Sequence, residues 1–282
     1  MIRPMREEDV DAAHELTVTA FDTYSRSRGE APEPVPDPST IPPRYLHPLR
    51  TDPGGCWVAE EDGRLTGCAI ALVREGVWGL SLLAVHPDRQ SGGIGRELLQ
   101  ATWRYGADAR GWIIMASGDP RALRSYARLG LTGHPVFIAE GEPRGIEVAD
   151  GVRVGSLADQ ALCDAADRYA RGAAHGPDIG AYLEMGLTMV VAEDRGYAMI
   201  RTDAGVRQLA AFDEDGARAV LRGALAHLEG HKIAVESLSA LQAWAVPVCL
   251  DAGLQLRAGS GALFTGGDVG PFTPYLPSGA FL

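Results

Sequence analysis

The sequence predicts an α/β protein built from two similar halves in tandem, and three observations carry this prediction. Short apolar runs with strand character alternate with segments whose apolar residues repeat at helical spacing. One of these strands continues through a glycine-rich turn directly into a helix, over residues 80–105. Short sequence matches then recur in the same order in the second half of the chain, which indicates an internal duplication.

The composition excludes several classes of protein. With 282 residues, 46% of them hydrophobic and 22% charged, the chain can form one large domain or two ordinary ones around a buried core. The net charge of −11 argues against non-specific nucleic-acid binding, and no apolar run approaches the length that spans a membrane. We expect a cytoplasmic protein without a signal peptide. We also expect buried structural thiols and no metal, because the four cysteines and seven histidines lack ligand spacing.

The first elements of the chain are an edge strand and a helix. Residues 2–4 form the strand, since an edge tolerates Pro4, and the apolar residues between 10 and 20 fall at helical spacing. Residues 30–53 hold many prolines, so they cannot form a continuous helix or an interior strand. This stretch is either a substrate lid or a solvated linker, and residues 45–49 suggest one short docked helix within it.

A hairpin and the glycine-rich turn follow. Residues 56–60 and 65–70 flank an Asp-Gly turn, which is typical of a β-hairpin. Strand 77–85 leads into the turn, and a helix begins at about Gly93. Its apolar residues lie on one face, at Ile94, Leu98, Ala101 and Tyr105.

The first half closes with a strand, a capped helix and a further strand. The apolar run 112–117 is a buried strand, and 136–139 is the last strand. Between them Asp119 is a good N-cap, Pro120 suits the first helical position, and Gly130 ends the helix.

The second half repeats the first with one informative difference. We expect a domain at 1–141, a polar linker at 142–151 and a second domain at 152–282. Val152-Arg153 followed by Asp159 matches Ile2-Arg3 followed by Asp9, and 233–237 matches 113–117. Where the first half has the glycine-rich turn, the second has 212–217 with three carboxylates, which would repel a phosphate. The second half is therefore expected to be degenerate and to bind no coenzyme.

The turn is physically an anion site. Gly92, Gly93 and Gly95 have no Cβ, so a ligand can lie against the backbone, and the following helix presents unpaired N–H groups at its positive end. A P-loop requires Lys-Ser/Thr where this chain has Arg96-Glu97, and the dinucleotide fingerprint requires a third glycine at Leu98. The alternative is an ordinary glycine-rich connection.

Two motifs resemble those of a known family. Gln90-x-x-Gly93-x-Gly95, after Val85-His86-Pro87, resembles the coenzyme A pyrophosphate loop of the GNAT acyltransferases. Residues 119–131 resemble the second GNAT motif, a helix that ends in Tyr126-x-x-x-Gly130, with leucine in place of the usual aromatic residue. The chain is therefore similar to tandem GNAT proteins, here with a degenerate second half. The resemblance implies that each half is a mixed twisted sheet flanked by helices.

The same resemblance implies a ligand and a general acid. Acetyl-CoA would be the cosubstrate, with its pantetheine arm along a strand that splays from 112–117. Tyr126 would donate a proton to the leaving thiolate, unless it is only a core tyrosine. The residues expected to contact the coenzyme are Leu83, Val85, Gln90, Ser91, Gly92, Gly93, Ile94, Gly95, Arg96 and Asp119.

No general base is evident in the sequence. The central strand offers no carboxylate, and Asp22, Glu30 and Glu184 are candidates only because they are acidic and near expected loops. The tail 270–282 is apolar and proline-stiffened, so we expect it to dock in a groove. By resemblance to tandem members, the terminal carboxylate of Leu282 could then be the base. The alternative is a tail that only completes the second sheet.

We predict an acetyl-CoA-dependent N-acyltransferase. The acceptor would be a primary amine of an unidentified small molecule or peptide, attacking the thioester directly in a ternary complex, because no activated Cys or Ser is evident. No nucleic acid or membrane partner is expected, and the protein would be a monomer or a homodimer. The alternatives are a catalytically silent CoA-binding regulatory protein and a nucleotide-binding enzyme of another class.

Overall fold

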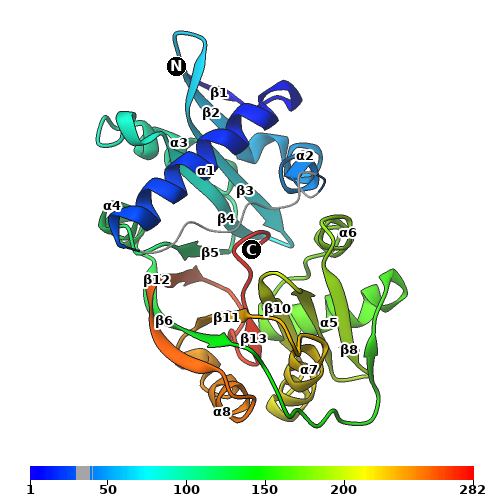
Figure 1. The fold of residues 1–282 in the computed structure, drawn as a ribbon. Coiled ribbons are helices and arrows are strands. Elements are labelled where there is room, and N and C mark those ends of the chain that lie inside the picture. Colours follow the sequence, from blue (N-terminus) through cyan, green and yellow to red (C-terminus); the bar gives the residue numbers. More distant parts are fainter. Residues whose placement is uncertain (30–38, 40) are drawn as a thin grey trace.

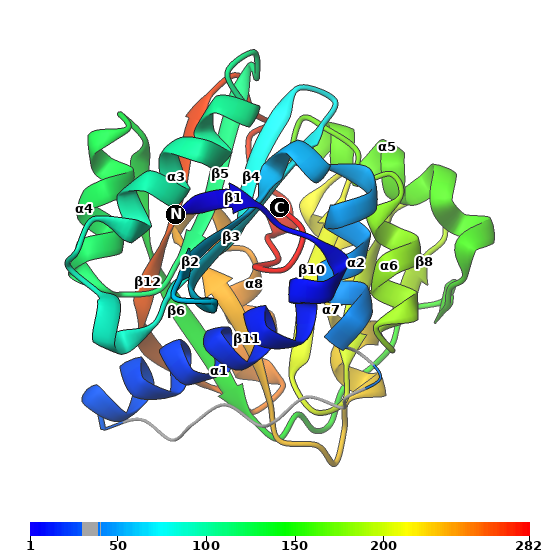
Figure 2. The same cartoon turned by 90° about the horizontal axis from the view of Figure 1, so that it is seen from above.

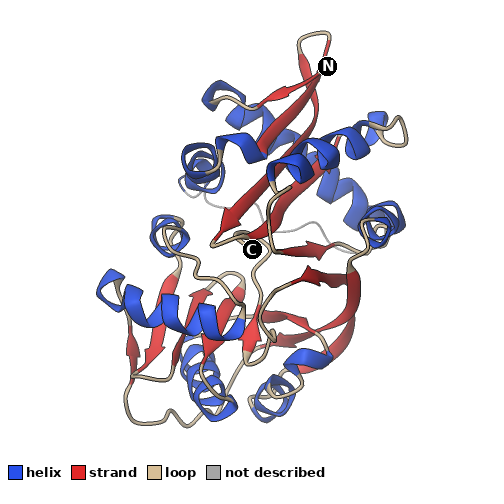
Figure 3. Cartoon of the chain, turned by 180° about the vertical axis from the view of Figure 1, so that it is seen from behind, coloured by secondary structure: helices blue, strands red, loops and turns tan. Residues whose placement is uncertain are grey.

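The computed structural model describes residues 1–29, 39 and 41–282 (Figure 1). Its strands form one mixed sheet flanked by helices, which confirms the predicted α/β class (Figure 3). Among the described residues no helix combines the length and apolarity needed to cross a bilayer. Apart from single 3-10 turns, the first half comprises β1 (Ile2–Pro4), α1 (Val10–Ser27), α2 (Ile41–Thr51), β2 (Cys56–Glu61), β3 (Arg64–Arg74), β4 (Val77–Val85), α3 (Ile94–Tyr105), β5 (Gly111–Ala116), α4 (Pro120–Arg128) and β6 (Thr132–Gly141). The second half comprises β7 (Val152–Val154), α5 (Gln160–Ala170), α6 (Asp178–Glu184), β8 (Thr188–Ala192), β9 (Gly196–Arg201), β10 (Gly205–Ala211), α7 (Glu214–His227), β11 (Ile233–Leu238), α8 (Ala245–Asp251), β12 (Gln255–Gly267) and β13 (Tyr275–Leu276).

The local predictions for the first half are confirmed. β1 lies at the edge of the sheet, and the β2–β3 hairpin turns at Asp62 and Gly63 with φ of 50° and 75°. α1 buries the predicted apolar face, and α2 is the short docked helix, with Tyr45 in the core. Whether residues 30–38 and 40 form a lid or a linker lies outside the described residues.

The last strand of each half is exchanged between the halves. β6 pairs antiparallel with β11, whereas β12 returns to pair antiparallel with β5, and the two exchanged strands also pair with each other. The sheet therefore runs without a break from β1 to β7. β6 ends at Gly141 and β7 begins at Val152, at the expected linker. The sequence did not predict the exchange, and the division into a catalytic and a degenerate domain stays a prediction.

The internal duplication is visible in a repeated ion pair. Arg3 on β1 pairs with Asp9 at 2.7 Å. Arg153 on β7 pairs with Asp159 at 2.6 Å. In each half the arginine on the first strand thus reaches the acidic residue just before the first helix, so the matched sequences occupy matched places in the two halves.

A buried ionic network joins the two halves where α2 packs against α6. Asp178 on α6 lies 2.6 Å from both Nη2 of Arg74 and Nε2 of His47, and Arg74 also contacts Asp52 at 2.7 Å. Burial alone would raise the pKa of the Asp178 carboxyl, but hydrogen bonds from His47 and Arg74 outweigh it and hold the pKa below 3.8. The charged form of Asp178 therefore stabilises the contact between the halves.

We expect Asp178→Asn to lower the free energy of unfolding by about 3–5 kcal/mol at neutral pH, because it leaves Arg74 buried with less compensating charge. The pKa of Asp178 is lower in the folded protein than in the unfolded chain. Its contribution is therefore complete above pH 3.8 and is lost as the pH falls through the folded pKa. Urea unfolding measured at neutral pH and again in acid should show that the difference in unfolding free energy between wild type and variant becomes smaller in acid. Asp108→Asn, at an exposed position, is the control; equal stability of the two variants would contradict the prediction.

Candidate active site

The site opens where β4 and β5 separate. The two strands are parallel and paired only from Val77–Gly111 to Leu80–Ile114. A bulge at Ser81, where the β3–β4 register shifts, then turns β4 away from β5. Beyond Leu80 no described strand pairs with β4 on that side, so an extended ligand could bind along this edge of β4. This confirms that β4 splays from β5, as predicted.

The glycine-rich turn closes one end of this opening. Gly93 is the N-cap of α3 and has a φ of +95°, in the left-handed region that favours glycine. A Cβ at Gly93 would lie 3.9 Å from the Nη2 atom of Arg96, so that guanidinium lies beside the turn. The side chain of Gln90 donates to the carbonyl of Val85 at 3.1 Å and holds the turn against the end of β4. The helix N-terminus and Arg96 together make the turn electropositive.

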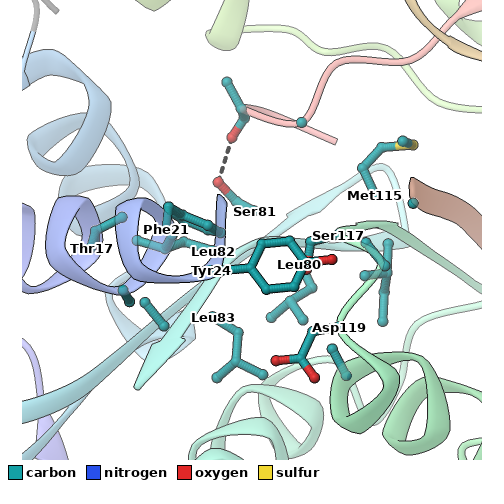
Figure 4. A pocket seen from close by; sticks show the side chains of 18 of the residues that line it. Thr17, Phe21, Tyr24, Leu80, Ser81, Leu82, Leu83, Met115, Ser117 and Asp119 are labelled. Atoms are coloured by element: carbon teal, nitrogen blue, oxygen red, sulfur yellow. Dashed lines mark hydrogen bonds between the residues drawn. The ribbon is translucent and has the colours of Figure 1, made fainter. Parts of the chain in front are cut away.

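A cavity of about 1450 Å³ runs from this turn into the second half of the molecule. Figure 4 shows its first-half wall. There Thr17, Phe21 and Tyr24 of α1 face the part of β4 that follows Leu80, where β4 has separated from β5. Its second-half wall consists of side chains from α6, β9, β10, β11 and β12, together with the tail. Of the residues expected to contact the coenzyme, Leu83, Val85, Gln90, Ser91, Gly92, Gly93, Gly95, Arg96 and Asp119 line the cavity. The side chain of Ile94 instead packs against a core cluster.

Tyr126 lines the same cavity and is only 5% exposed. Burial, and then the charge of Asp119, raise the pKa of its phenol well above the ordinary value of 10. The phenol therefore stays protonated at neutral pH and can donate. Its ring packs edge-on against Phe264 at 5.6 Å between centroids, and Phe264 belongs to the exchanged strand β12. The second half thus helps to position Tyr126.

Asp119 lines the cavity and also has a structural role at the start of α4. Its carboxylate caps α4 by accepting from the backbone N–H of Arg121 at 2.8 Å, and it also pairs with the Arg121 side chain at 2.6 Å. The hydrogen bond from the Arg121 side chain lowers the pKa of Asp119. The predicted N-cap is confirmed, whereas contact with a coenzyme stays a prediction.

The tail docks between the halves, near the centre of the molecule (Figure 2). The Ser81 hydroxyl donates to the carbonyl of Ala280, and residues 278–280 line the cavity. Leu282 is buried beyond them against Gly79, and its carbonyl oxygen is 2.7 Å from where a Cβ on Gly79 would lie. Gly79 is still paired with Ile113. Leu282 therefore packs on the part of the sheet where β4 and β5 are joined, and it does not line the cavity. The docked tail is confirmed, but the role of Leu282 as a base stays a prediction that this placement does not favour.

The other candidate bases lie apart from one another. Asp22 on α1 lines the cavity. Glu184 ends α6 and is exposed away from it, and Glu30 lies outside the described residues. The structure brings Arg44 and Tyr24 to the cavity as well. Sequence reasoning missed both, because neither belongs to a motif and Arg44 lies in the proline-rich stretch.

None of the four cysteines is placed to act as a nucleophile. All are buried, and burial raises the pKa of Cys68 to about 11 and that of Cys56 to about 12. At neutral pH these thiols are protonated and therefore weakly nucleophilic. The predicted structural role of the cysteines fits their burial.

Comparison with known proteins agrees with this geometry. Residues 18–131 match the family model described as Acetyltransferase (GNAT) family. Over 72 residues the chain is 42% identical to mycothiol acetyltransferase of Thermobifida fusca, a match that spans 25% of this chain and 22% of that relative. A Pyrococcus horikoshii protein classed with the acetyltransferases has the same fold, with a TM-score of 0.80 at 16% identity over 100% of this chain and 95% of that one.

A tandem protein also shares the fold. The tandem GNAT protein from the clavulanic acid biosynthesis pathway aligns with a TM-score of 0.57 at 14% identity, over 95% of this chain and 98% of that one. Likeness at this identity shows the fold alone, and it extends across both halves. The family match covers the splayed strands, the glycine-rich turn and Tyr126. The chain therefore contains an acetyltransferase domain of the GNAT family, within a fold that a tandem GNAT protein shares.

Proposed function

We propose that the protein transfers an acetyl group from acetyl-CoA to a primary amine of a small molecule or peptide. The observation that carries the proposal is the opening between β4 and β5, which joins the electropositive turn and Tyr126 in one cavity. The turn would bind the pyrophosphate through its N–H groups, with Arg96 beside it. The backbone of Leu83 and Val85, on the edge of β4 that no described strand covers, would lie along the amides of the pantetheine arm.

The reaction would be direct attack in a ternary complex. The neutral amine attacks the thioester carbonyl, a C–N bond forms, and the C–S bond breaks as the tetrahedral intermediate collapses. Tyr126 donates its proton to the departing sulfur, and the proton of the attacking nitrogen leaves to an ordered water or a cavity carboxylate such as Asp22. Protonated cysteines away from this path fit a mechanism without a covalent enzyme intermediate.

We further propose that residues 1–141 form the catalytic unit, 142–151 a linker and 152–282 a degenerate copy. In the second half the N-terminus of α7 is already capped, because the Asp213 carboxylate accepts from the N–H of Gly216 at 2.6 Å. Glu214 and Asp215 add negative charge in the first turn of that helix. We therefore expect one acetyl-CoA per chain. Calorimetric titration should give a stoichiometry near one, and two equivalent sites would contradict it.

A thiol-release assay tests the proposed activity. Purified protein is incubated with acetyl-CoA and a panel of primary amines, and the release of free CoA is measured against a blank without amine. Amine-dependent release supports acetyl transfer. Tight acetyl-CoA binding without release on any amine would instead indicate a silent CoA-binding protein. A melting shift with ATP or NAD but not with acetyl-CoA would indicate another class of enzyme.

A further inference from the structure

Arg44 on α2 is a cavity-wall arginine that is partly buried, whereas Arg96, Arg124 and Arg128 on the same wall are exposed. Its Nη2 atom donates to the carbonyl of Ser81 at 2.9 Å. Its Nη1 atom is fully buried and has no hydrogen-bond partner. No side-chain carboxylate among the described residues pairs with it, and the described groups that act on its charge are tyrosines and cysteines. The guanidinium is therefore a buried cation to which no described side chain brings a counter-charge.

Burying a positive charge costs folding free energy unless an opposite charge or hydrogen-bond acceptors compensate it. A buried charge normally pairs with an opposite charge, as Arg74 does with Asp52 and Asp178 in the same molecule. The second-half arginines on the cavity wall have carboxylate partners too. They are Arg201 with Asp203, Arg207 with Glu236 and Arg257 with Glu140. Burial lowers the pKa of Arg44, and the nearby tyrosines and cysteines offset this only in part. We therefore infer that a negatively charged ligand compensates Arg44.

The location of Arg44 places this ligand on the acceptor side of the site. Ser81, whose carbonyl accepts from Arg44, is the first residue of β4 after the last pair with β5, where the two strands begin to separate. The guanidinium carbon lies 5.5 Å from the ring centroid of Phe281, so the tail and β4 hold the group from two sides. The glycine-rich turn and Arg96 lie at the other end of the unpaired segment of β4, where the coenzyme phosphates would bind. An anion at Arg44 is therefore separate from those phosphates.

We propose that Arg44 binds a carboxylate of the acceptor, so that the acceptor is an amine that also carries a carboxylate. This inference rests on the proposed acetyl transfer. The planar guanidinium matches the two oxygens of a carboxylate in a forked geometry, and the buried Nη1 supplies a donor that lacks an acceptor. A carboxylate brings one negative charge to one uncompensated positive charge. A phosphate monoester would bring more charge than this apolar and aromatic surrounding compensates.

Matched pairs of amines test the inference. The probes are the ω-amino acids from glycine to 6-aminohexanoate, each with its neutral amide, assayed at saturating acetyl-CoA. For the chain length that fits, wild type should acetylate the acid with a kcat/KM about 10- to 100-fold above that for the amide. Arg44→Met should bring the ratio of acid to amide close to one, and Arg44→Lys should restore part of it. Arg50→Met, at the exposed end of the same helix, should keep the full ratio.

The ratio separates recognition from a merely structural role. If Arg44 only supports β4 and the tail, Arg44→Met will lower the rates with acid and amide equally and leave the ratio unchanged, which overturns the inference. If aminoalkyl phosphates are preferred over the acids, the carboxylate assignment is wrong. Calorimetry of the same pairs on CoA-saturated protein distinguishes this inference from the proposed function. An Arg44-dependent preference for acids in binding, with no probe acetylated, supports the inference and rejects acetyl transfer of these amines. No preference in either measurement overturns the inference.

Discussion

Replacing Gly93 with aspartate is expected to weaken acetyl-CoA binding by at least about 100-fold, in effect abolishing it. Two causes act together at this position. The φ of +95° strains any residue that has a Cβ, and the carboxylate would lie beside the pyrophosphate at the N-terminus of α3. Calorimetric titration of the purified variant with acetyl-CoA measures the effect.

Two matched variants separate these causes. Gly93→Asn has nearly the same shape without the charge and tolerates left-handed backbone better than most residues, so it should retain more affinity than Gly93→Asp. Gly63→Asp adds the same strain and charge in the β2–β3 turn, where the position has a φ of +75° and a Cβ meets no atom within 4 Å. It should bind acetyl-CoA as wild type does. Full affinity in Gly93→Asp would remove the turn from the proposed coenzyme site.

Replacing Tyr126 with phenylalanine is expected to lower kcat by about 10- to 1000-fold while the affinity for acetyl-CoA stays unchanged. The change removes one oxygen, whereas the packing of the ring against Phe264 remains. Because burial holds the pKa of Tyr126 above its ordinary value of 10, this acid should not cause a loss of activity on the alkaline side below pH 10. Single-turnover rates across the pH range, with a verified acceptor, measure both effects.

The control for this prediction is Tyr169→Phe, at an exposed tyrosine of the second half that packs against Phe212. It should leave the single-turnover rate unchanged. If Tyr126→Phe also leaves that rate unchanged, Tyr126 is not the proton donor. The buried ring would then be a core tyrosine, the alternative that the sequence left open.

Much of the fold and part of the site could be predicted because their signals are local. The cap at Asp119, the hairpin at Gly63 and the turn at Gly93 each depend on a few neighbouring residues. Their backbone preferences arise from side-chain geometry within one or two turns of chain. The family motifs are local as well, and the resemblance they carry implied one ligand for Tyr126 and the glycine-rich turn, which line one cavity in the structure.

The position of Leu282 shows where this reasoning stops. Its apolar tail predicted docking, and the tail docks, but the groove that receives it is made by strands and helices of both halves. Which part of β4 the last residue meets depends on the whole interface. The sequence therefore indicated that the tail is buried, and the structure placed Leu282 against Gly79, where β4 and β5 are still paired.

By itself the sequence determined the α/β class, the duplication, the local turns and caps, and the glycine-rich turn at the start of α3. Only the tertiary structure decided that β6 and β12 are exchanged, that both halves line the cavity, and that Arg44 lies there with a buried Nη1 atom that has no hydrogen-bond partner. The physical reason is one of range. Turns and caps are stabilised by contacts between near neighbours in the chain. The partner of a strand and the compensation of a buried charge depend instead on groups about a hundred residues or more apart, as Arg74 and Asp178 are, which only the folded packing brings together.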